Sequence, residues 1–349
     1  MKTTNKTHFL LATSAIVSVA AFTATPAFAG IFPQAGEGGS EITNESELDS
    51  NPNIDLFLSG NQGTNNSDQV ENLNFNTDVA IGDSSTGGQS SNDIDAVIAD
   101  DPDSNITLNI ENTDGAEART LTVNGTITED ASENLDVVVN GGANGATNVD
   151  VDADIDLATN NAGTLTVDSA ANDANLTVFG DITTNSGNGG VTLDGSDAGS
   201  ASLTFDGITQ SVDGDVDSAN TGGAGTSIAV ENGSDVTFSD NVGATNAIET
   251  LNVTSGDATF VGTANFDGDV TGAGTMTNQS AVNVEGDISV AGVELDTSGD
   301  LILDGGGSEA QIVNATVDGT TNDDGDITVN NTGGATFNGV IGGGTDNRV

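Results

Sequence analysis

The sequence contains no Cys, Trp or Tyr, and its single His, His8, lies near the N-terminus. Disulfides are therefore excluded, and so are metal sites built on thiolate or imidazole ligands. Catalytic arrangements of Ser/His/Asp or Cys/His are excluded as well, because His8 belongs to a segment that we expect to be cleaved. Sugar-binding clefts commonly rely on aromatic walls, for which Trp and Tyr are missing. These absences predict that the protein is not an enzyme.

Basic residues are scarce too: four Lys and Arg stand against 54 Asp and Glu, which gives a formal net charge of −50. Lys2 and Lys6 belong to the N-terminal segment, so Arg119 and Arg348 are the only basic residues after it. Such a charge repels nucleic acid and anionic lipid, so a nucleic-acid partner is excluded. The remaining enzymatic alternative is a polysaccharide-acting β-helix enzyme. Arg119 is the one internal residue that could act as the catalytic base in such an enzyme. We interpret it instead as a charge partner.

Residues 1–29 predict a signal peptide. Two lysines precede the apolar run FLLATSAIVSVAAF, and Ala27-Phe28-Ala29 forms a small-x-small cleavage signal before Gly30. The apolar run is short for a membrane span, and no later run is long enough to form a transmembrane segment in the mature chain. We therefore expect export by the Sec route and a mature protein that begins at Gly30.

Proline is absent after Pro102. Strands that are paired on both edges cannot spare a backbone N–H, so this absence is typical of a continuous sheet. Residues 30–102 are rich in Asn, Ser, Gly and Glu with isolated apolar clusters, and we expect a loosely ordered N-terminal region or cap there. Residues 103–349 are expected to form a continuous β-region.

From Ile106 onward, short runs in which apolar and polar residues alternate predict β-strands. No window shows the apolar stripe of a helix, so the expected fold class is all-β. The expected strands lie at 106–110, 121–127, 135–139, 149–157, 165–168, 176–182, 191–195, 203–207, 236–238, 251–253, 258–262, 282–290, 301–305 and 327–331.

A degenerate repeat, apolar-x-apolar-Asn/Asp-Gly, occurs as LTVNG, VVVNG, VTLDG, LTFDG, ANFDG and LILDG. Asn, Asp and Gly tolerate positive φ, which suits a sharp turn after a strand. The pair fits the turn of a hairpin in an antiparallel meander or sandwich, or the corner of a parallel solenoid with coils of about 20 residues. We favour a parallel β-helix, a β-solenoid of irregular coils, because few aromatic residues suit a thin core repeated along an axis.

The run NVDVDADIDLA at 148–158 alternates apolar residues with Asp150, Asp152, Asp154 and Asp156. Along one strand, neighbouring carboxylates lie roughly 6.6 Å apart, too far to share one calcium ion. Carboxylates from coils stacked about 4.8 Å apart suit a shared ion better. We interpret the row as a solvated outer face and keep weak calcium binding at these four residues as the alternative. No other cofactor is expected.

The stretch SDNVGATNAIETLNVTSGDATFVGTANFDGDVTGAGT at 239–275 resembles repeated passages in the passenger domains of bacterial autotransporters, especially surface-layer proteins of the rickettsial outer-membrane protein B type. The matching phrase comprises Asn241, Gly243, Thr245, Asn246, Ala247, Thr250 and Leu251. The resemblance implies a β-helical passenger, carried across the outer membrane of a Gram-negative bacterium and displayed on the cell surface.

Together these patterns predict an exported structural protein of the cell surface, of surface-layer or autotransporter-passenger type, with a coat or adhesion role. In a coat, copies associate with one another and divalent cations bridge their acidic faces. The alternative is a secreted adhesin that binds a receptor on a host or neighbouring cell. No small-molecule substrate is expected in either role.

Overall fold

The computed structural model describes residues 105–343, apart from gaps at 114–116, 130–133, 143–144, 159–162, 185–189, 196–198, 222–223, 306 and 322–324, together with five strands between 40 and 96. Within these residues there is no helix long and apolar enough to cross a membrane. The expected signal peptide, 1–29, lies outside the described residues.

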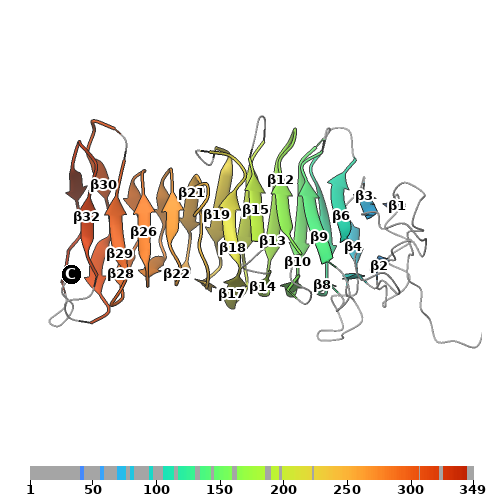
Figure 1. The fold of residues 1–349 in the computed structure, drawn as a ribbon, viewed down its shortest axis with the longest axis horizontal. Helices are drawn as coiled ribbons and strands as arrows, with labels where there is room; N and C mark the ends of the chain where they lie inside the picture. The colour runs from blue at the N-terminus through green and yellow to red at the C-terminus, as the bar shows by residue number, and fades with distance from the viewer. Residues whose placement is uncertain are drawn as a thin grey trace, which may run out of the picture.

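The described strands form an elongated solenoid (Figure 1). Strands run across the long axis, and an internal strand such as β10 pairs with one strand in the coil before it and one in the coil after it. The N-terminal strands lie at one end of the rod and the red C-terminal strands at the other. Every pairing between described strands is parallel, which confirms the β-solenoid and rules out the antiparallel meander or sandwich.

Three faces, named A, B and C, run along the rod. Face A contains β1 (Ser40–Ile42), β3 (Gln69–Phe75), β6 (Asn105–Asn112), β9 (Asn134–Asn140), β12 (Leu165–Asp168), β15 (Gly190–Asp194) and β18 (Asp215–Ser218). Single bridges at Val242 and Ile248 continue it to β23 (Ala264–Phe266), β26 (Ala281–Val284), β29 (Asp300–Leu303) and β32 (Ile327–Val329). Face B contains β2 (Leu56–Leu58), β5 (Ile94–Ala96), β8 (Ile127–Glu129), β11 (Ile155–Asp156), β14 (Ile182–Thr183), β17 (Thr209–Asp213), β20 (Ser234–Phe238), β22 (Gly256–Phe260), β25 (Thr275–Asn278), β28 (Gly292–Leu295) and β31 (Thr316–Gly319). Face C contains β4 (Val79–Ile81), β7 (Arg119–Val123), β10 (Thr147–Val151), β13 (Ala174–Val178), β16 (Ala201–Phe205), β19 (Thr226–Val230), β21 (Thr250–Val253), β24 (Val270–Gly272), β27 (Ile288–Ser289), β30 (Gln311–Val313) and β33 (Ala335–Phe337).

The N-terminal strands belong to the same three faces. β3 pairs with β6, β4 with β7 and β5 with β8, all in parallel. The solenoid therefore extends into the segment 30–102, for which the sequence predicts a loosely ordered region or cap. The expected boundary at 102/103 falls outside the described residues.

The coils differ in length along the rod. Val149 stacks on Leu121, 28 residues earlier, and Leu176 follows 27 residues later. Val270, by contrast, stacks on Ile288 after only 18 residues. The expected coil of about 20 residues thus holds near β24 and is too short for the coils around β10.

The longest alternating runs are not single strands. The runs at 121–127, 149–157, 176–182 and 282–290 each contain two strands separated by a corner. In the second of them, β10 ends at Val151 and β11 begins at Ile155, and both residues are buried. The alternation continues around the corner because residues on both sides point into one core. The alternation of apolar and polar residues therefore predicts the inward positions correctly but not the ends of the strands.

The Asn/Asp-Gly pairs lie at corners, but not for the expected reason. The repeat glycines Gly207 and Gly268 do not have positive φ. A Cβ at Gly207 would overlap the carbonyl oxygen of Phe179 in the preceding coil, and one at Gly268 would overlap that of Glu249. Close approach of stacked backbones, rather than backbone conformation, selects glycine at these positions.

The interior is a narrow apolar column. Inward residues from Leu108 to Val317 are buried, while their neighbours along each strand face outward. Phe238 stacks on Phe260 with ring centroids 5.2 Å apart, and further phenylalanines pack edge-on at both sides of this pair. Because each coil contributes few apolar side chains, the core depends on the coils above and below.

Gly256→Ala is expected to destabilise the solenoid more than Gly233→Ala. Both glycines have positive φ, +91° and +84°, so each alanine carries a backbone penalty of about 1–2 kcal/mol. Only at Gly256 would the new Cβ also overlap the preceding coil, at the carbonyl oxygen of Ser234, whereas the space at Gly233 is open. Urea unfolding followed by circular dichroism measures the two midpoints. Equal shifts would contradict the role of close stacking.

Candidate functional site: the acidic corners

The predicted calcium ligands do not lie along one strand. Asp150 is on β10 of face C, Asp156 is on β11 of face B, and Asp152 and Asp154 occupy the corner between them. Across the described part of the chain, no group of three or more acidic side chains is arranged to hold a metal ion. Calcium binding at these four residues remains a prediction that rests on charge alone.

Asp154 instead joins three coils. Its carboxylate accepts the backbone N–H of Asp181 in the following coil at 2.8 Å, and its main-chain carbonyl accepts the N–H of Ile127 in the preceding coil at 3.0 Å. Asp181 repeats this arrangement with Ser211 at 2.6 Å and Ile155 at 2.8 Å. We call such a residue a corner clamp: an aspartate before the first inward residue of a strand whose carboxylate accepts a backbone N–H of the next coil.

Corner clamps recur on all three faces. The other clamps and their donors are Asp173 with Ser200, Asp215 with Asn241, Asp269 with Asp287, Asp287 with Ile312, and Asp300 with Asp326. Their N···O distances lie between 2.8 and 3.1 Å. Hydrogen bonds to an ionised carboxylate are stronger than neutral ones. Part of the acidic surface therefore has a structural role.

A sequence signal for the clamps exists in the triplet Gly-Asp-apolar. In five of its occurrences, at 180–182, 214–216, 268–270, 286–288 and 299–301, the aspartate is a clamp. The glycine is needed because the corner approaches the preceding coil closely: at Gly286 an added Cβ would overlap the backbone of Gly268. The donor of each clamp is not predictable from spacing, since it lies anywhere from 18 to 30 residues away.

Two buried glutamines support corners from the inside. The side-chain amide of Gln210 donates to the carbonyls of Val178 and Gly180, both at 2.8 Å, and its oxygen accepts the N–H of Gly207. Gln311 makes the same three bonds in a later coil. Buried amides that are fully bonded in this way are part of the scaffold.

Acids on neighbouring coils are brought close enough to affect one another. Burial raises the pKa of Asp150, a hydrogen bond from Thr177 opposes this, and the charges of Asp152 and Asp206 raise the pKa further. Burial is also the largest cause of the raised pKa of Asp152. Burial is also the main cause of the raised pKa of Asp240, and the charges of Asp213 and Asp215 raise it further. The pKa of Glu285 is raised in the same way, by burial and then by the charges of Asp267 and Asp304.

Arg119 begins β7 and forms an ion pair with Glu117 at 3.2 Å. The pair agrees with the interpretation of Arg119 as a charge partner. Glu117 is largely exposed, and pairs of this kind contribute about 0–1 kcal/mol to stability. The pair has little effect on the fold as a whole.

The residues from Asn241 to Leu251, which carry the family resemblance, connect one corner to the neighbouring coils. The side-chain amide of Asn241 donates to Asp215 and its oxygen accepts the N–H of Thr263, both at 3.1 Å. Asn246 donates to the carbonyl of Ser218 at 3.0 Å. These contacts lie where face A narrows to single bridges, so the polar residues of the phrase replace missing strand pairing.

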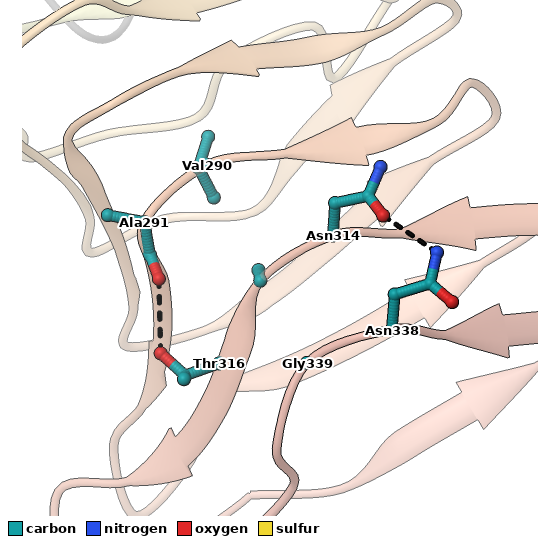
Figure 2. Close-up of a pocket in the computed structure, with 7 residues that line it drawn as sticks. Val290, Ala291, Asn314, Thr316, Asn338 and Gly339 are labelled. Carbon is teal, nitrogen blue, oxygen red and sulfur yellow. Dashed lines mark hydrogen bonds between the residues drawn. The ribbon is translucent and has the colours of Figure 1, made fainter.

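Figure 2 shows an open hollow at the corner between faces C and B in the last coils. Its volume is about 330 Å³, and it is lined by Val290, Ala291, Asn314, Ala315, Thr316, Asn338 and Gly339. Asn338 donates to the side-chain oxygen of Asn314 at 2.8 Å, and the Thr316 hydroxyl donates to the carbonyl of Ala291 at 3.1 Å. The polar groups of the hollow are thus used in bonds between coils.

No family model matches the chain, and neither does any curated protein or solved structure. The class of protein is therefore defined by the fold: a three-faced parallel β-solenoid whose corners are joined by aspartates.

Asp287→Ala is expected to lower the free energy of unfolding by about 1–2 kcal/mol, because the backbone N–H of Ile312 loses its acceptor. Asp287→Asn keeps an oxygen acceptor and should lose less. Asp257→Ala is the matched control: Asp257 stands in the same kind of triplet, at 256–258, but no described residue donates to its carboxylate. Urea unfolding followed by circular dichroism compares the three. Equal losses for Asp287→Ala and Asp257→Ala would contradict the clamp.

Asp150→Asn is expected to stabilise the protein at neutral pH. Burial raises the pKa of Asp150 above its ordinary 3.8, so the folded state binds a proton more tightly and stability falls as pH rises through this interval. Asn carries no charge and retains an acceptor for Thr177, so its advantage should vanish below pH 3.8. Thermal unfolding from about pH 3 to about pH 8 measures this. Glu294→Gln, on an exposed position of β28, is the control. An advantage that persists at acid pH would contradict the assignment.

Proposed function

We propose that this protein is an exported structural protein of the bacterial cell surface, of surface-layer or autotransporter-passenger type, with a non-catalytic coat or adhesion role. The observation that carries the proposal is the continuous solenoid, in which a narrow core and clamped corners extend one cross-section along a rod. Such rods present extended binding surfaces. The features of residues 1–29 support export, and the phrase that begins at Asn241 supports the passenger type.

A coat role is favoured by repetition on the outer faces. On face C, Asn175 donates to Asn148 at 2.8 Å, and Ser202 donates to Asn175 at 2.6 Å, so equivalent positions of three successive coils form one polar row. A partner with its own repeated faces, such as another copy of the chain, matches such a row coil by coil. The strongly acidic composition keeps the faces soluble until a contact of the right chemistry forms.

Surface exposure is the test of this proposal. In a Gram-negative host that makes this chain, the protein is expected to be labelled by antibody on intact cells, and its mass should correspond to a start at Gly30. Ala29→Arg, which removes a small residue from the cleavage signal, should leave the N-terminal segment attached, and Asp257→Ala should not. Wild-type protein that stays in the cytoplasm with residues 1–29 attached would contradict export.

A further inference from the structure

The outer side of face C carries very little charge, although the chain has 54 acidic residues. Strand pairing places its outward side chains in two rows along the rod, and Asp150 is the only acid in them. We call these two rows the neutral surface. The first row is Thr120, Asn148, Asn175, Ser202, Ser227 and Thr250, and the second is Thr122, Asp150, Thr177, Thr204, Ala229, Asn252, Thr271 and Ser289.

The surroundings of the neutral surface extend its pattern. Asn314 and Asn338 continue the second row in the last described coils, and Figure 2 shows the hydrogen bond between them. At the end of the first row stand Asp269 and Asp287, whose carboxylates are already used as corner clamps. The second row is therefore uncharged from Thr177 to Asn338.

Faces A and B differ from face C in their outward charge. On face A, Asp168 lies directly opposite Asp194 of the next coil. On face B, Asp235 lies opposite Asp257, and Glu294 lies opposite Asp318. Two copies that met through either of these faces would bring rows of carboxylates together, and like charges placed opposite each other at an interface oppose binding.

The side chains of the neutral surface are small and partly ordered. Asn175 donates to Asn148 and accepts from Ser202, so the first row is hydrogen-bonded along the rod before any partner binds. Side chains that are already ordered lose less entropy on binding. Adjacent rows on a strand lie about 6.6 Å apart, which leaves a shallow furrow between them. Stacked rows of small side chains in two such sheets can interdigitate, as they do in steric zippers.

A second copy of this chain fits the neutral surface in repeat, charge and size. From Thr122 to Asn338 the second row rises by nine coils, or about 43 Å, and a strand of five residues is about 16 Å wide. The surface therefore measures about 700 Å² per copy, and the total of about 1,400 Å² lies in the range of specific interfaces. We propose that two copies pair face to face through the neutral surface of face C.

Such a contact uses the same surface on both copies, so it has two-fold symmetry and closes at a dimer. It leaves the acidic faces A and B outward and needs no bridging cation. The remaining charge on each copy still opposes association, so the dimer should strengthen as salt screens that charge. The inference rests on the proposed function in that it specifies the face through which copies in a coat meet.

Sedimentation equilibrium of the purified protein over a concentration series, with a chelator and about 0.15 M salt, tests the contact. A monomer–dimer equilibrium is expected. Thr204→Asp and Ser227→Asp each add a charge to the neutral surface of both copies and should raise the dimer Kd about tenfold or more. Asp150→Asn removes the only acid from the two rows and should lower the Kd.

Thr237→Asp is the matched control, because Thr237 is a half-buried outward residue of face B with neutral partners, Ser211 and Thr259, in the coils on either side. Its Kd should stay that of the wild type. Circular dichroism identifies any variant that does not fold. Asp150→Asn introduces no charge, so it remains informative if both face C aspartate variants unfold.

Dimers that weaken in the folded face C variants, but not in Thr237→Asp, support the inference. A protein that is monomeric at every concentration, or whose association weakens equally in Thr237→Asp, overturns it. Association that appears only when calcium replaces the chelator also overturns it, since cations would then bridge the acidic faces. The result is separable from the proposed function: monomers exposed on cells reject only the face C contact, and dimers of a cytoplasmic protein reject only the surface role.

Discussion

The backbone hydrogen bonds of the strands run along the rod, so a strand satisfies its N–H and C=O groups through the coils on either side. The same neighbours cover its few inward side chains. Glycine at the corners allows this approach, clamp aspartates bond the strand starts, and Gln210 and Gln311 bond the corner carbonyls from within. Stacking is thus the constraint to which each of these residue types responds.

Stacking of the coils gives several of the acidic side chains a structural role. A composition of 54 acids and four basic residues would suit a chain that stays unfolded or one that collects cations. In the described coils, several of these carboxylates accept backbone N–H groups, a role that requires no positive side chain. Burial, followed by nearby like charges, raises the pKa of others, such as Asp150 and Asp240, so the acidic surface contains both carboxylates that join coils and carboxylates whose ionised form is disfavoured.

The sequence predicted the parallel solenoid and the inward residues, because alternation reports which side chains face the core. It misplaced strand ends, as at Val151 and Ile155, because alternation does not change where the chain turns a corner around a single column. The clamp role of Asp154 was not predictable, since its donor at Asp181 is set by the length of one irregular coil. The Gly-Asp-apolar triplet carries that information only once the stacking is known.

The variation in strand pairing along the rod has a mechanical consequence. A pull on the two ends of the rod applies the same force to every boundary between coils. The boundary with the fewest paired residues therefore yields first, and the other boundaries add nothing to its resistance. On face C, β10 and β13 share five paired residues, whereas β27 and β30 share one. Under tension on face C, this solenoid would begin to part between β27 and β30, and the coils towards the N-terminus would keep their stacking.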